Sequence, residues 1–74
     1  MASVGESVIV QDPDIHSGEP VFRGTRVPFQ TLLDYLEGGE TLAEFLEQFP
    51  GVSRGQPIAA LEEAKALLLA RFGK

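Results

Sequence analysis

The side chains best suited to chemistry in this 74-residue chain include two arginines three positions apart. Arg23 and Arg26 flank the Gly24-Thr25 turn, and guanidinium groups bind phosphates or carboxylates through paired hydrogen bonds. They are therefore candidates for gripping an anionic ligand or an acidic partner. The alternative, which the residues alone favour, is that both are solvated or pair with the nearby acids Asp12, Asp14 and Glu19.

A second polar group precedes the last predicted helix and consists of Ser53, Arg54 and Gln56. In a helix-turn-helix, residues at this position contact base edges in a DNA groove. We interpret these three as candidate DNA-binding residues. The alternative is that any three-helix bundle has two helices joined by a tight turn, and Glu62 and Glu63 on the same helix would repel phosphates.

No residue pattern predicts catalysis, a metal site or a cofactor. The chain lacks cysteine and has one histidine, His16, whereas a metal site needs several ligands. We expect His16 to be an exposed turn residue. Glu62 and Glu63 are adjacent and diverge on a helix, so they cannot act as a facing acid and base. The sequence therefore predicts a non-catalytic protein.

Length and charge restrict the function further. A chain this short forms one domain and buries only about 60% of its surface on folding, so a partner or twin subunit is expected to add stability. The net charge of −5 disfavours a free-standing nucleic-acid binder and suits a protein that covers a basic partner, but it is also ordinary for a soluble protein. No secretion signal or membrane-spanning run is present, so a cytoplasmic protein without a membrane partner is predicted.

Two extended segments and two helices follow from the residue pattern. Residues 8–10 and 20–23 are β-prone runs separated by turn signals, which predicts a small β arm over 7–27. Apolar spacing predicts a helix from Pro28, in its first helical position, to the Gly38-Gly39 pair. Thr41 and Glu44 match a capping box and predict a second helix that ends at Pro50.

A third helix is expected to start between residues 54 and 57 and to run to about Phe72. Two signals at its start conflict. A capping box from Ser53 to Gln56 would place Pro57 at the fourth helical position, where the helix needs a backbone amide that proline lacks. The helix is apolar around most of its circumference. Burial under the other two helices explains part of this, and the rest predicts an interface to a twin subunit or a different protein. The interface candidates are Leu67, Leu68, Leu69 and Phe72.

These elements predict a mainly α single domain over residues 1–74, with the β arm at 7–27 and a three-helix body at 28–73. Several segments resemble domain-of-unknown-function family 433, a group regarded as VapB-like antitoxins. The resemblance covers about residues 7 to 70. It is carried by Asp12-Pro-Asp-Ile15, the Gly-x-Pro-x-x-x-Gly-Thr-Arg pattern, the leucines of the first helix and Phe49-Pro-Gly-Val-Ser53. The pattern residues expected to hold the junction between arm and first helix are Gly18, Pro20, Gly24, Thr25 and Arg26.

The resemblance implies a homeodomain-like or winged helix-turn-helix with a small β arm, commonly dimeric. It also implies a role beside a PIN-like toxin, a metal-dependent ribonuclease that the antitoxin neutralises. We therefore expect a homodimeric antitoxin of a type II toxin–antitoxin pair, whose acidic surface and apolar third helix cover the ribonuclease and which also binds operator DNA. The alternative is a stand-alone helix-turn-helix regulator or a protein-interaction module without a toxin.

Overall fold

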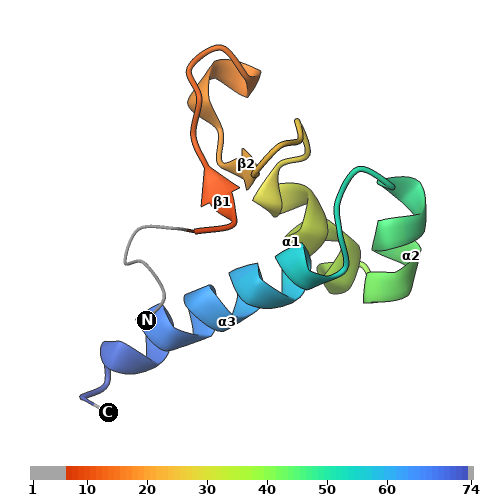
Figure 1. Ribbon diagram of the computed structural model, residues 1–74. Helices are drawn as coiled ribbons and strands as arrows, with labels where there is room; N and C mark the ends of the chain where they lie inside the picture. Colours follow the sequence, from red (N-terminus) through yellow and green to blue (C-terminus); the bar gives the residue numbers. More distant parts are fainter. Residues whose placement is uncertain (1–6, 74) are drawn as a thin grey trace.

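The computed structural model describes residues 7–73 as a two-stranded sheet followed by three helices (Figure 1). Strands β1 (Ile9–Val10) and β2 (Val21–Phe22) are antiparallel, with Ile9 opposite Phe22. A short 3-10 turn, His16–Gly18, lies in the connection between them. The helices are α1 (Phe29–Glu37), α2 (Leu42–Gln48) and α3 (Gly55–Ala70). The prediction of a mainly helical chain with a small N-terminal β arm is confirmed.

Helices α1 and α2 start at the signals that the sequence carries. Pro28 is the N-cap of α1 and Phe29 its first residue, so the helix begins one position later than predicted. At the start of α2, the Thr41 hydroxyl accepts from the Glu44 amide at 3.1 Å, and Glu44 Oε1 accepts from the Thr41 amide at 2.7 Å. The predicted capping box is therefore confirmed.

The core lies where β2, α1, α2 and the start of α3 meet. Phe45 is at its centre, with ring centroids 6.1 Å from Phe22, 5.6 Å from Tyr35 and 5.1 Å from Phe49. Aromatic rings at such separations add to the energy of apolar burial. The buried members of this cluster are Phe22, Leu32, Phe45, Val52 and Ala60. This core fixes the β arm and the three helix starts relative to one another.

Helix α3 belongs to the body only over its first turns. Pro57 and Ala60 are buried and Leu61 is half-buried, but every residue from 62 to 73 is exposed. In Figure 1 the second half of α3 extends away from the other labelled elements. Helix α1, which contacts both α2 and α3, occupies the centre of the bundle. The expectation that α3 is a covered central helix therefore holds only for its first turns, because the body is shorter than the helix.

Pro57 fits the first turn of α3 without conflict. Arg54 is the N-cap and Gly55 the first helical residue, so Pro57 is the third, where an amide has no intrahelical partner in any case. Half of the expected capping box forms, because Gln56 Oε1 accepts from the Ser53 amide at 3.0 Å while the Ser53 side chain makes no cap bond. Helix α3 thus begins within the predicted window and ends at Ala70, slightly earlier than predicted.

Candidate functional site

The turn after β2 joins the β arm to α1. Gly24 has a φ of +79°, a conformation that residues with a side chain rarely adopt. The Thr25 hydroxyl donates to the carbonyl of Phe22 at 2.8 Å and accepts from the amide of Val27 at 3.0 Å, which closes the turn. At the arm's other end Gly18 also has a positive φ, of 89°. The first residue of α1 is tied to the arm as well, because the Phe29 amide donates to the Pro20 carbonyl at 3.0 Å.

Arg23 and Arg26 have different surroundings. The Arg23 guanidinium donates to the Ser7 carbonyl from Nε at 3.1 Å and from Nη2 at 2.8 Å, and so holds the start of the arm. The Arg26 guanidinium makes no hydrogen bond or ion pair with any residue between 7 and 73; only its carbonyl is used, by His16 Nε2 at 2.8 Å. His16 is exposed, as predicted. Of the two arginines, Arg26 is the one whose guanidinium has no partner within residues 7–73.

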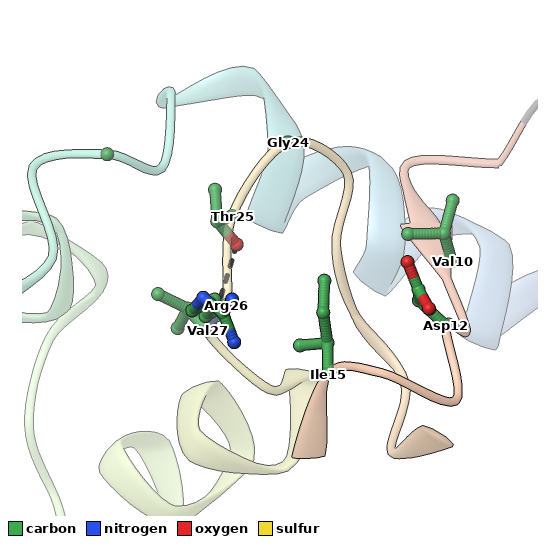
Figure 2. A pocket seen from close by; sticks show the side chains of 8 residues that line it. Val10, Asp12, Ile15, Gly24, Thr25, Arg26 and Val27 are labelled. Atoms are coloured by element: carbon green, nitrogen blue, oxygen red, sulfur yellow. Dashed lines mark hydrogen bonds between the residues drawn. The ribbon is translucent and has the colours of Figure 1, made fainter. Parts of the chain in front are cut away.

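Arg26 borders a pocket of about 620 Å³ between the β arm and the Gly24 turn. Figure 2 shows Val10, Asp12 and Ile15 on the arm side and Thr25, Arg26 and Val27 on the other. The lining is mostly apolar, and its charged side chains are Asp12 and Arg26. Gly51, which precedes α3, also lines this pocket. The pocket therefore suits a small ligand with an apolar body and a charged end. Among residues 7–73, no cluster of acidic or histidine side chains could hold a metal ion.

The three candidate DNA-binding residues differ in exposure and in hydrogen bonding. Ser53 and Arg54 are exposed before the first turn of α3. Gln56 is half-buried and its amide is engaged within the chain, because Nε2 donates to the Arg23 carbonyl at 2.9 Å while Oε1 accepts from Ser53. A contact between Gln56 and a base would require these bonds to break. Arg54 and Ser53 therefore remain the residues of this group that a ligand can reach.

The exposed charged side chains of the α1–α2 segment are all acidic, and we call them the acidic surface. Between Arg26 and Arg54 the chain carries no lysine or arginine. Every acidic residue in this segment is exposed. Their combined charge of −5 equals the net charge of the whole chain. These residues are Asp34, Glu37, Glu40, Glu44 and Glu47. All lysines and arginines lie before or after this segment and are balanced there by an equal number of other acidic residues, so the net charge of the chain comes from this segment.

The second half of α3 presents an apolar surface. The large side chains here are exposed to between 50% and 70%: Leu67, Leu68 and Leu69 lie in the helix, and Phe72 lies two residues beyond its end at Ala70. A groove of about 170 Å³ opens where α3 leaves the body. It is lined by Ile9, Phe29, Ala60, Glu63, Ala64 and Leu67. Exposed apolar area of this kind is typical of interaction sites, so these residues stay interface candidates.

Two features were missed by reasoning from the sequence. One is the groove beside α3, and the other is the bond that the Ser7 hydroxyl donates to Glu63 Oε1 at 2.6 Å. Both join residues far apart in the chain, which no local pattern predicts. The acidic surface had a sequence signal, namely the absence of any base between Arg26 and Arg54. No helix within the described residues is long and apolar enough to cross a membrane.

Comparison with known proteins identifies a family. A family model described as protein of unknown function (DUF433) matches residues 9–64. No curated protein and no solved structure matches the chain. The matched span contains the β arm, α1, α2 and the part of α3 that packs on the body, and it ends before the exposed apolar residues from Leu67 onward. The chain therefore belongs to the DUF433 family of proteins of unknown function.

Proposed function

We propose that this protein is a non-catalytic antitoxin that neutralises a PIN-like ribonuclease, its partner in a type II toxin–antitoxin pair. The observation that carries the proposal is the acidic surface of α1 and α2, which holds exposed carboxylates and no base. An enzyme that binds RNA must present basic side chains to the phosphates. Exposed carboxylates in a segment without any base complement a basic RNA-binding groove, and a protein bound there through them would exclude RNA from it.

The fold holds these carboxylates on a stable frame. Helix α1 packs against α2 through Tyr35, whose ring lies 5.6 Å from Phe45 and 5.8 Å from Phe49. The capping box at Thr41 fixes the start of α2. Because the two helices are ordered before any partner binds, little conformational entropy is lost when the carboxylates meet basic groups.

The test is co-purification with the product of the adjacent reading frame, followed by a ribonuclease assay. We expect the chain to bind that product and to suppress its activity, and we expect added salt to weaken the complex. The double variant Glu37→Lys, Glu47→Lys should lose at least tenfold in affinity, whereas the matched change Glu19→Lys on the exposed β arm should have little effect. A neighbour that neither binds the chain nor cleaves RNA would contradict the proposal.

A stand-alone helix-turn-helix regulator, of homeodomain-like or winged type, is the second candidate. It is supported by the exposed Ser53 and Arg54, and by the proximity of this segment to two more arginines: Gln56 bonds to Arg23, and Arg26 lines a pocket with Gly51. It ranks second because the connection between α2 and α3, residues 49–54, exceeds the three to four residues of a typical helix-turn-helix turn.

A gel shift on the protein's own promoter at two salt concentrations tests this second function. We expect Arg54→Ala to weaken binding at all sequences and to lower its salt dependence, which is the behaviour of a phosphate contact. Lys65→Ala is the matched control, because Lys65 pairs with Glu62 at 2.8 Å in the exposed half of α3. The absence of a shift, with or without a partner protein, would remove this candidate.

A further inference from the structure

The loop between the two strands forms one wall of the pocket that Arg26 borders, and hydrogen bonds hold this loop in shape. The Ile15 amide donates to the Asp12 carbonyl at 2.8 Å, and the Gly18 amide donates to the Ile15 carbonyl at 2.9 Å. His16 Nε2 donates to the Arg26 carbonyl at 2.8 Å and so ties this wall to the opposite one. The pocket is therefore formed before any ligand arrives, as is usual for sites that bind small molecules.

Two residues of this loop have strained backbone conformations. His16 and Ser17 have φ values of 49° and 56°, in the left-handed region that is uncommon for residues with a side chain. Such conformations persist only where the surrounding structure holds them, and they are concentrated at functional sites. Here the hydrogen bonds at His16 and Gly18 hold them. Because the strained loop shapes the pocket wall at Ile15, its backbone supports a binding role independently of the cavity itself.

The apolar lining on the arm side lies outside the core. Val10 and Ile15 are half-buried, but neither is among the side chains that form the core cluster or pack against it. Both line the pocket instead, together with Val27. A ligand that covers these side chains removes apolar area from water, which is favourable. The lining therefore fits a ligand with a small aliphatic body.

The two charged groups of the lining are not paired with each other. Figure 2 shows Asp12 on the arm side and Arg26 on the other. Neither side chain forms an ion pair within residues 7–73. Asp12 Oδ1 accepts from the Asp14 amide at 2.9 Å, which leaves the carboxylate without a cation. A ligand with one anionic and one cationic group satisfies both charges, whereas a simple anion is opposed by Asp12 and by the net charge of −5.

We propose that this pocket binds a small aliphatic amino acid as a zwitterion. The ligand's carboxylate pairs with the Arg26 guanidinium, and its ammonium group pairs with the Asp12 carboxylate. Its aliphatic body lies against Val10, Ile15 and Val27. An α-amino acid carries its two charges close together and an ω-amino acid carries them further apart, so one of each is used in the test.

An amino acid in this pocket should stabilise the folded chain. The lining comes from the arm, the Gly24 turn and Gly51 before α3, so the ligand contacts three segments that are separate in the sequence. A ligand that binds only the folded form raises the free energy of unfolding by mass action. This inference goes beyond the antitoxin proposal and does not depend on it, because the residues of the acidic surface do not line the pocket.

Titration calorimetry of the purified chain tests the class of ligand. The probes are the zwitterions leucine and ε-aminocaproate and the single-charge molecules hexanoate and hexylamine. We expect the better zwitterion to bind at least about fivefold more tightly than either single-charge probe, because it alone satisfies both charges. It should also raise the melting temperature of the chain. If neither zwitterion binds at millimolar concentration, or if the preference over a single-charge probe is smaller than this, the proposal is wrong.

Substitutions at the two charges locate the site. Arg26→Gln should weaken the zwitterion at least about tenfold, because the carboxylate loses its guanidinium partner. Asp12→Asn should abolish the preference over hexanoate, and its amide oxygen can still accept from the Asp14 amide, so the loop is kept. The controls Lys65→Gln and Asp14→Asn remove the same charges outside the pocket and should leave binding unchanged. Unweakened binding to Arg26→Gln, or an unchanged preference in Asp12→Asn, with circular dichroism showing each variant folded, would overturn the proposal.

Discussion

Gln56 links the start of α3 to the β arm through the carbonyl of Arg23, to which its Nε2 donates at 2.9 Å. These residues are 33 positions apart in the sequence. The other end of the same side chain accepts from the Ser53 amide at 3.0 Å. One amide group thus sets both where α3 begins and how it meets the Gly24 turn, so the helix start and the arm are stabilised together.

Replacing Gln56 should therefore destabilise the fold. We expect Gln56→Ala to lower the free energy of unfolding by about 1–2 kcal/mol, because two hydrogen bonds are lost and a turn is released. Urea denaturation measures this value. Gln48→Ala is the control, since Gln48 is exposed at the end of α2 and its change should stay within about 0.5 kcal/mol. Equal effects at the two positions would contradict the role assigned to Gln56.

Replacing Gly24 by any residue with a side chain should destabilise the fold. A Cβ at Gly24 or at Gly51 would meet no atom within 4 Å, so space does not distinguish them. Only Gly24 has a positive φ, of 79°. Gly24→Ala should cost about 1–2 kcal/mol of unfolding free energy through this strain. Gly51→Ala should be neutral, or stabilising by up to about 1 kcal/mol through the unfolded chain. Thermal or urea unfolding of both variants decides, and a similar loss in both would refute the backbone explanation.

Much of the local structure could be predicted because its causes are local. The capping box at Thr41 and Glu44 and the start of α3 depend on residues within four positions of each other, and both are observed. The β-prone runs form the two strands of the arm, whereas their register, with Ile9 opposite Phe22, is not determined by the sequence pattern. These local preferences are seen in the folded chain because the tertiary contacts favour the same backbone conformations.

The features that could not be predicted depend on contacts between residues far apart in the chain, which local sequence patterns do not reveal. The apolar content of α3 suggested a covered central helix, but how much of it is covered depends on the size of the body, and only Pro57 and Ala60 are buried. The sequence gives no reason to separate the polar residues Ser53, Arg54 and Gln56. In the structure Gln56 is hydrogen-bonded to the Arg23 carbonyl, whereas the other two are exposed. The free guanidinium of Arg26 and the bound one of Arg23 likewise could not be distinguished by residue type.

The centre of the core should be far more sensitive than the apolar end of α3. Leu32 in α1 is fully buried, whereas Leu69 is 50% exposed. Leu32→Ala should lower the free energy of unfolding by about 2–5 kcal/mol, because it removes buried methyl groups and leaves a cavity. Leu69→Ala should change it by less than about 1 kcal/mol. Denaturation monitored by circular dichroism compares the two, and a large loss at Leu69 would show that its side of α3 is covered.

The two arginines of the Gly24 turn should separate a structural role from a binding role. Arg23→Ala removes two hydrogen bonds to the Ser7 carbonyl and should cost about 1 kcal/mol of unfolding free energy. Arg26→Ala removes a guanidinium with no described intramolecular partner, so stability should stay within about 0.5 kcal/mol. If Arg26 serves a ligand at the pocket that it borders, its replacement should weaken partner binding measured by calorimetry while Arg26→Lys, which keeps the charge, recovers part of it. A loss of stability at Arg26 equal to that at Arg23 would assign both arginines to the fold and would leave the pocket without its free charged side chain.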